Sequence, residues 1–551
     1  MNLDSLRSSS ILSNKSRVKT SDIKLDRYQR LHSYINIIAL ESMKWMILLA
    51  TLAILPAWSC KTSASDLNST EEAKEEAANE LALLSGDGGV IRITPSSDGV
   101  RVYSEFRSFS VVSAFSRNSV NKEYIYQDPQ GVELIKGLGA HALRFPGGSF
   151  AGKFKPFEDK YAKLIDAHIK LSKETGITNC ILVLNFLSGT VEEAKFVVKE
   201  LKEGGINIIA VELGNEIHLK KYRKSITDVE AYVRVSAKYL EELKRLLPNA
   251  EFGIPVPSSR HVFDAEQMGS RVQFFEHWIA TLSEAVSSGE LEVDAVIPHF
   301  YKQTHMVYKL PTKFERFHGV MKEMRINSYD FLDQAVINYY DTHFSGLDLW
   351  ITEWGLKEKQ IYGNTLSEGL HVTSFLMDMM RGNMLTSNRI THSAYQKLHS
   401  RPSNGLISEV GTLPPVEPAS IYKPETPWYA FHFINDIIAG GATITRSKIS
   451  GVSQDQVRIE TFRKGDDFYV LFANRTGKEY RINMAGTARY LYGDHPWSSN
   501  GMAFWHKDNS TEKYDPVKLV DGNITNVIQP WSFGYIKADW TKISQDLGGK
   551  K

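Results

Sequence analysis

The chain has 551 residues, which exceeds one ordinary domain, although a (β/α)8 barrel by itself takes about 250 residues or more. Its 65 basic and 64 acidic side chains give a net charge of +1, so nothing in the composition predicts a nucleic-acid partner. Its two cysteines, Cys60 and Cys180, are too few for a disulfide framework or a cysteine-rich zinc site.

The N-terminal region has the parts of a signal peptide. From Met43, the sequence MKWMILLATLAILPAWSC contains one lysine, an apolar stretch shorter than the roughly 20 residues of a membrane span, and small residues before Cys60. We interpret 43–60 as the signal peptide, 1–42 as a non-native or disordered extension, and 61–86 as a tether. The alternative is an uncleaved signal anchor with a short cytoplasmic tail.

The ending AWSC resembles the lipobox of bacterial lipoproteins. This resemblance implies cleavage before Cys60, acylation of its thiol, and a lipid anchor in the bacterial cell envelope. Membrane contact is then expected only through that anchor.

From about residue 107, short apolar runs alternate with longer amphipathic segments, which is typical of βα units and a parallel sheet. The apolar runs predict eight strands, at 107–115, 140–148, 177–186, 207–216, 250–258, 293–301, 347–355 and 389–398. Eight such units predict a closed (β/α)8 barrel over 87–440. A doubly wound open sheet is the alternative, but no glycine-rich phosphate loop follows the first strand.

The pattern changes after residue 440. Short alternating runs separated by turns, with no long helical period, predict an antiparallel β-sandwich over 441–541, followed by a tail at 542–551. The segment 87–103 is also β-like and can add strands to this second domain.

Two of the predicted barrel strands end in a glutamate. Glu216 closes ELGNE on the fourth strand, and Glu353 follows WIT on the seventh. If the strands stay regular, Glu216 shares a face with Glu212, and Glu353 shares one with Ile351. Either glutamate alone is commonly a solvated strand end. Together they end strands on opposite sides of a barrel mouth, where catalytic groups of such barrels gather, so their side chains can converge.

Two converging carboxylates suit the cleavage of a glycosidic bond, which needs a proton on the leaving oxygen and a nucleophile at the anomeric carbon. We assign Glu216 as the acid/base, with its pKa raised by burial and repulsion, and Glu353 as the ionised nucleophile. A retaining enzyme places the two carboxyl groups about 5–5.5 Å apart, and an inverting enzyme about 6.5–9.5 Å. This chemistry predicts no cofactor, and no spacing of ligands predicts a metal site.

The motifs GNE and TEWG, ending the fourth and seventh strands, resemble glycoside hydrolase clan A, the retaining (β/α)8-barrel glycosidases. With LRFPGGS on the second strand, the chain is most similar to the arabinofuranosidase and heparanase/β-glucuronidase families of that clan. The resemblance covers about 105–440 and extends to the appended β-domain. It implies a retaining glycoside hydrolase whose partner is a polysaccharide or oligosaccharide.

The resemblance also implies roles for residues beside the glutamates. Asn215 would bind the sugar hydroxyl next to the reacting carbon, although an Asn after Gly is often only a turn residue. Arg144 would lie against Glu353. The alternative is a structural ion pair with Glu212, and the two roles are compatible. Trp354 neighbours Glu353 and is expected to point away from it, into outer packing.

The sixth strand carries His299 and Tyr301 on one face, where clan members place side chains that orient the nucleophile and the sugar. A core histidine is the alternative for His299. Asn185, at the end of the third strand, is a further substrate-binding candidate. The last strand departs from the clan pattern, because it offers His392 and Tyr395 where many members have a tryptophan.

Other function classes fit less well. A non-catalytic carbohydrate-binding surface lipoprotein on the same scaffold is the main alternative, and the intact glutamate pair argues against it. Lyase or aldolase chemistry would need a lysine at a strand end, and none is suitably placed.

Overall fold

The computed structural model describes residues 86–102, 104–118, 122–258, 271–302, 334–356, 363–386, 389–400, 405–409, 421–499, 502–505, 510–513 and 515–543. The predicted signal peptide and Cys60 therefore lie outside the described residues. No helix within these ranges has both the length and the apolar character required to cross a membrane.

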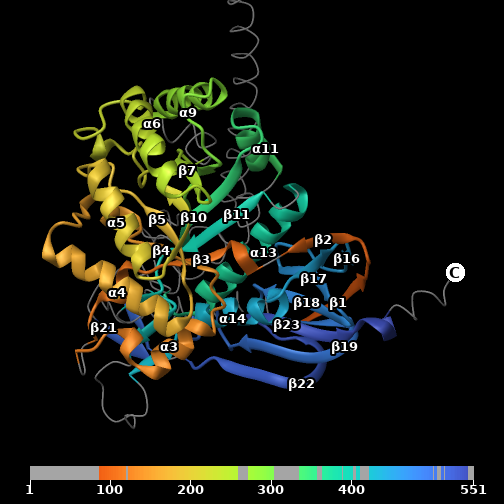
Figure 1. Cartoon of the computed structure of the whole chain (residues 1–551). Coiled ribbons are helices and arrows are strands. Elements are labelled where there is room, and N and C mark those ends of the chain that lie inside the picture. The colour runs from red at the N-terminus through yellow and green to blue at the C-terminus, as the bar shows by residue number, and fades with distance from the viewer. Residues whose placement is uncertain are drawn as a thin grey trace, which may run out of the picture. The chain divides into compact units, whose positions relative to one another are not determined.

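Eight parallel strands form a closed barrel, which confirms the fold class (Figure 1). The strands are β3 (Arg107–Ser110), β4 (Ala142–Phe145), β5 (Asn179–Val183), β6 (Asn207–Glu212), β7 (Glu251–Pro255), β8 (Ala295–Ile297), β10 (Asp348–Leu356) and β11 (Ile390–Tyr395). The barrel closes because β11 pairs with both β10 and β3. A short extra strand, β9 (Phe300–Lys302), continues from β8 and pairs with the end of β10.

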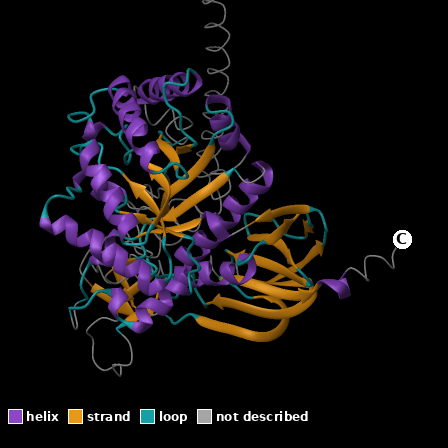
Figure 2. Ribbon diagram, viewed as in Figure 1, coloured by secondary structure: helices purple, strands orange, loops and turns teal. Residues whose placement is uncertain are grey.

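Helices surround the barrel strands (Figure 2). They are α3 (Pro129–Lys136), α4 (Asp159–Thr175), α5 (Val191–Glu203), α6 (Val229–Leu246), α9 (Arg271–Ser287), α11 (Gln334–His343), α13 (Leu366–Thr386) and α14 (Thr426–Ile438). Local capping sets where several of them begin. Asp228 accepts a hydrogen bond from the backbone N–H of Ala231 at the start of α6, and Thr190 and Glu193 form a capping box on α5.

The lower barrel interior is filled by one large side chain among small ones. Trp350 is fully buried there with the alanines of β4, β6 and β8. Gly253 on β7 leaves the room that the indole needs, because a Cβ at Gly253 would come within 2.7 Å of it. This packing fills the N-terminal end of the barrel, so the buried polar side chains lie in the next layer toward the C-terminal end.

The second domain is a nine-stranded sheet with a small core of its own. Its strands are β1 (Gly86–Thr94), β2 (Gly99–Val102), β15 (Ala442–Thr445), β16 (Lys448–Ser450), β17 (Val457–Lys464), β18 (Asp467–Asn474), β19 (Lys478–Tyr492), β22 (Lys518–Ile528) and β23 (Ser532–Asp539). The sheet is mixed, because β1 runs parallel to β19 while the other pairs are antiparallel. The predicted antiparallel β-sandwich is thus corrected to one mixed sheet, since the parallel partner β1 comes from the segment that precedes the barrel.

The boundary between the domains is not a single cut at residue 440. Strands β1 and β2 precede the barrel in the sequence but pair with β16, β19 and β15, as the β-like segment 87–103 allowed. Two smaller sheets complete the fold, β12 (His399–Ser400) with β13 (Ile407–Glu409) and β14 (Tyr422–Pro424), and β20 (Met502–Trp505) with β21 (Ser510–Lys513).

Candidate active site

Arg144 organises a buried charged layer above Trp350. Its Nε and Nη2 donate to the two carboxylate oxygens of Glu212 at 2.8 and 2.7 Å, and its Nη1 donates to Glu353 Oε2 at 3.1 Å. Its side chain is wholly buried, and that of Glu212 is 1% exposed. The two roles considered for Arg144 therefore both occur: it forms a structural ion pair, and it contacts the predicted nucleophile.

Arg144 also donates to Asn215 Oδ1 at 2.9 Å and to the hydroxyl of Ser110 at 3.4 Å. The sequence analysis did not select Ser110, although it is the last residue of β3 and its position at a strand end was a usable signal. Asn215 Nδ2 is buried and has no hydrogen-bond partner among the described residues. The amide is thus oriented by its oxygen, while its nitrogen remains able to donate.

Glu353 faces this layer because β10 is irregular. Trp350 points into the barrel interior, whereas Ile351 and Trp354 belong to the outer core. The pairing of β10 with β11 shifts register between Ile351 and Trp354, and an irregularity of this kind re-aims the side chains that follow it. The expectation that Ile351 shares the face of Glu353 is therefore wrong. The expectation of outer packing for Trp354 is confirmed.

Tyr301 supplies the second donor to Glu353. Its hydroxyl donates to Glu353 Oε1 at 2.5 Å, while Arg144 holds Oε2. Burial, followed by the charge of Glu353, raises the pKa of Tyr301 well above its ordinary value, so the phenol stays protonated. Both carboxylate oxygens of Glu353 are consequently fixed, although the side chain remains 16% exposed.

Glu216 lies in a turn rather than on a strand. Strand β6 ends at Glu212, and the chain then turns through Gly214 at φ +101° and Glu216 at φ +50°. A left-handed conformation costs a side-chain-bearing residue about 1–3 kcal/mol, so the surrounding structure must hold it. Part of that support is the Tyr232 hydroxyl on α6, which donates to the carbonyl of Leu213 at 2.8 Å. The predicted shared face with Glu212 is wrong because regular alternation stops at the strand end.

The two glutamates meet. One carboxylate oxygen of Glu216, one of Glu353 and a ring nitrogen of His299 all lie within 4.8 Å of one another. His299 Nδ1 is 3.4 Å from Glu216 Oε1 and 3.9 Å from Glu353 Oε2. This approach of single oxygens favours the retaining separation of about 5–5.5 Å between the carboxyl groups over the inverting one of about 6.5–9.5 Å.

The same three side chains are the group of described residues that could hold a metal ion. The charges around them oppose this use, because Arg144 is buried beside Glu353, and Tyr301 occupies its other oxygen. A dication would have to displace these donors.

The pKa values show a proton shared between a carboxyl and an imidazole. Burial raises the pKa of Glu216, but the hydrogen bond and charge of His299 lower it to about 2. Burial lowers the pKa of His299, but Glu353 and Glu216 raise it above its ordinary value. In this arrangement the proton rests on His299. The predicted raised pKa of Glu216 is therefore wrong, because His299, which the sequence analysis placed beside the nucleophile, also lies against Glu216.

Glycines bring the backbone of the second strand's loop close to the site. Gly147 and Gly148 have φ of +69° and +57°, which fits their interpretation as turn residues. A Cβ at Gly147 would lie 3.4 Å from Arg144 Nη1, and one at Gly148 would lie 3.8 Å from Glu353 Oε2. The LRFPGG motif therefore provides both the central guanidinium and a narrow backbone passage beside it.

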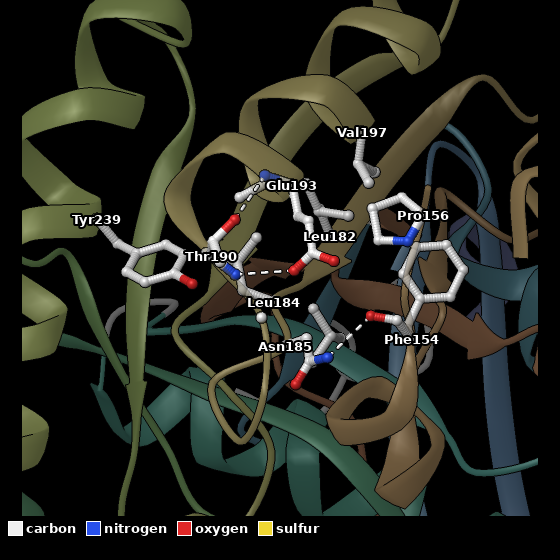
Figure 3. Close-up of a pocket in the computed structure, with 12 residues that line it drawn as sticks. Phe154, Pro156, Leu182, Leu184, Asn185, Thr190, Glu193, Val197 and Tyr239 are labelled. Atoms are coloured by element: carbon white, nitrogen blue, oxygen red, sulfur yellow. Dashed lines mark hydrogen bonds between the residues drawn. The ribbon is translucent and has the colours of Figure 1, made fainter. Parts of the chain in front are cut away.

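Asn185 has a different environment. Its Nδ2 donates to the carbonyl of Phe154 at 2.8 Å (Figure 3). Its Oδ1 accepts from the backbone N–H groups of Leu187 and Ser188. It lines a hollow of about 20 Å³ between β5 and α5, which has room for about one water molecule and not for a sugar. The structure does not bring Asn185 to the glutamate pair.

The last strand contributes structural contacts. The Tyr395 hydroxyl donates to Glu368 on α13 at 2.8 Å, and its ring packs against Trp354. His392 lies 3.2 Å from Glu251, the first residue of β7, and so at the N-terminal end of the barrel.

Comparisons with known proteins agree on the fold. No protein-family model and no curated protein matches the sequence. Among solved structures, AbfB, a family 51 α-L-arabinofuranosidase from Bifidobacterium longum, superposes with a TM-score of 0.56 at 15% identity, over 82% of this chain and 98% of that one. The α-L-arabinofuranosidase of Thermotoga maritima, in its arabinose complex, gives 0.53 at 15% identity, over 82% and 99%.

The chain has the fold of the family 51 α-L-arabinofuranosidases. A further match is BuGH86, determined in complex with neoagarooctaose, with a TM-score of 0.50 at 11% identity, over 83% of this chain and 78% of that one. These likenesses include the second domain, because they cover most of both chains. The clan A resemblance of the sequence is thus matched by structural similarity to glycosidases with a (β/α)8 barrel.

Proposed function

We propose that the protein is a retaining glycoside hydrolase in which Glu353 is the nucleophile and Glu216 the acid/base. The observation that carries the proposal is the approach of the two carboxylates to within 4.8 Å at the ends of β6 and β10. The fold shared with arabinofuranosidases supports it. The sugar chain of a polysaccharide or oligosaccharide is the proposed substrate.

In the first step, a carboxylate oxygen of Glu353 attacks the anomeric carbon while the bond to the leaving oxygen breaks and Glu216 protonates that oxygen. Arg144 and Tyr301 hold Glu353 in position for this attack. In the second step, Glu216 takes a proton from water, the water oxygen bonds to the anomeric carbon, and Glu353 is released. The free amide nitrogen of Asn215 supplies a donor for the adjacent sugar hydroxyl.

The shared proton gives His299 a part in the first step. The charge of Glu353 is the largest of the influences that raise the pKa of His299. That charge disappears as Glu353 bonds to the sugar, so the pKa of His299 falls during the attack. The proton then moves toward Glu216 and the leaving oxygen as the leaving group departs. Attack and protonation are coupled in this way by electrostatics.

The test uses Glu353→Gln, Glu216→Gln and a control, Glu251→Gln, at the opposite end of the barrel. Substrates are aryl glycosides and oligosaccharides, beginning with 4-nitrophenyl α-L-arabinofuranoside and agaro-oligosaccharides, which correspond to the compared proteins. We expect background turnover for Glu353→Gln and a loss of about 100- to 10,000-fold for Glu216→Gln. NMR of the first-formed anomer should show retention. Full turnover by a folded Glu353→Gln variant would exclude the mechanism.

A non-catalytic carbohydrate-binding lipoprotein predicts a different result. In that case, sugar binding by the wild-type protein occurs without turnover of any substrate. Calorimetry with the same oligosaccharides therefore distinguishes the two functions.

We further propose that Cys60 carries a lipid that anchors the protein to the bacterial cell envelope. The lipobox-like AWSC sequence supports this proposal. Labelled palmitate should enter the wild-type protein and be absent from Cys60→Ala. Equal labelling of both proteins would exclude acylation at this position.

A further inference from the structure

The loop after Glu216 carries an unusual concentration of positive charge. Four of its five residues from 220 to 224 are basic and exposed: Lys220, Lys221, Arg223 and Lys224. The loop is folded directly onto the predicted acid/base, because the backbone N–H of Leu219 donates to the carbonyl of Glu216 at 3.0 Å. A 3-10 turn, Lys220–Tyr222, follows at once. The charges are thus held at the site by backbone structure.

These cations have no carboxylate partners among the described residues. Two lysines of the nearby helices α5 and α6 do have acidic partners, since Lys195 pairs with Glu242 at 3.0 Å and Lys244 with Glu292 at 3.2 Å. Unpaired like charges close together repel one another, so their concentration has an energetic cost that an anion would offset.

Aromatic rings support two of the loop cations instead of acids. Lys221 Nζ lies 4.6 Å from the centroid of the Tyr222 ring, and the Arg223 guanidinium lies 4.1 Å from that of Phe274 on α9. A ring face orients a cation without using its hydrogen-bond donors. Arg223 therefore keeps its donors for a ligand, and Lys221 keeps those that do not bond to Tyr222.

The charges of both glutamates affect the pKa of Lys221. Burial lowers the pKa of Lys221, but Tyr222 and the charges of Glu216 and Glu353 raise it above its ordinary value. Conversely, these carboxylates would repel an anionic sugar that entered the site, whereas a neutral sugar would need no compensating cation. Cations beside the carboxylates remove that obstacle.

We propose that the segment 220–224 recognises carboxylate or sulfate groups on the sugar chain, so that the substrate is an anionic glycan. This inference rests on the proposed glycosidase function and names its substrate class. Lysine and arginine bind such groups through charge-assisted hydrogen bonds, and Arg223 can bind them through two parallel ones.

The test measures binding separately from turnover. In the full-length Glu353→Gln background, Lys220, Lys221 and Arg223 are replaced together by alanine. The matched control replaces Lys163, Lys170 and Lys173, three exposed lysines of α4 that have no ion pair among the described residues, so that both variants lose three charges. Affinity electrophoresis is run in gels containing hyaluronan, which carries only carboxylates, dextran sulfate, which carries only sulfates, or neutral dextran.

We expect retardation by hyaluronan or dextran sulfate and none by dextran, and the polymer that binds identifies the anionic group. The loop variant should weaken that binding about tenfold or more, and the α4 control less than about twofold. Equal weakening of the binding in both variants, or equal binding of dextran, would overturn the inference. If turnover depends on Glu353 but the loop variant binds the anionic polymer as tightly as its parent, the inference is overturned and the proposed function stands.

Discussion

Replacing Arg144 by methionine tests the charged layer on which the site is built. Glu212 has a fully buried partner in Arg144, and its own side chain is 1% exposed. Removing the guanidinium leaves the Glu212 carboxylate buried without a counter-charge, and removing one partner of such a pair costs about 3–5 kcal/mol of stability. Asn215 and Glu353 each lose one donor as well, so turnover should fall too.

The measurement is urea unfolding of the full-length chain, followed by tryptophan fluorescence, for Arg144→Met, Glu212→Met and the double variant. Replacing both partners removes the buried charge itself, so the double variant should recover at least half of the loss in the free energy of unfolding. A loss below about 1 kcal/mol for Arg144→Met, or a double variant as unstable as the sum of the single ones, would refute this reasoning.

Three further predictions concern single side chains. Tyr301→Phe removes one hydrogen bond to the Glu353 carboxylate, worth about 1.5–3 kcal/mol, so kcat/KM for an aryl glycoside should fall about 10- to 150-fold; an unchanged value would show that this bond does not act in the transition state. His299 lowers the pKa of Glu216, so the wild-type protein should lose stability as the pH falls from 4.5 to about 2. In His299→Asn the pKa of Glu216 is no longer lowered by the imidazole, so this acid-dependent loss of stability should be absent. The raised pKa of His299 stabilises the wild-type protein below pH 6.5, and this stability is lost as the pH rises through the raised pKa. The variant should lack this loss as well. Urea midpoints of both proteins across the two pH ranges measure the two effects, and parallel curves would contradict them. Trp354→Ala empties a fully buried space between the barrel and α13 and should cost about 3–5 kcal/mol in urea unfolding, whereas a cost below about 1 kcal/mol would mean that the site collapses around the change.

The barrel was predictable because its evidence is local. Each of the eight strands is a short apolar run. Seven of the predicted runs contain the strand that the structure forms there, and the eighth strand, β10, extends one residue beyond its run, to Leu356. The convergence of Glu216 and Glu353 also followed from the sequence, since the topology of a barrel brings strand ends to one mouth. Arg144, His299 and Tyr301 were selected because the resemblance to clan A implies roles for side chains at those positions.

The orientation of the side chains required the tertiary structure. Period-two alternation is a property of one regular strand, whereas the irregularity before Trp354 depends on how β10 pairs with its neighbour. The left-handed turn at Glu216 likewise depends on support from α6. The irregularity sets the direction of the Glu353 side chain and the turn sets that of Glu216, and regular alternation along a strand would have predicted both directions wrongly.

The sequence by itself determined the number and order of the barrel strands and the two carboxylates, because apolar runs and strand-end residues are read along the chain. Only the tertiary structure decided the membership of β1 and β2 in the second sheet, the double pairing of Arg144, and the contact between Glu216 and His299. These depend on distances between residues far apart in the sequence, and such distances exist only after the chain has packed.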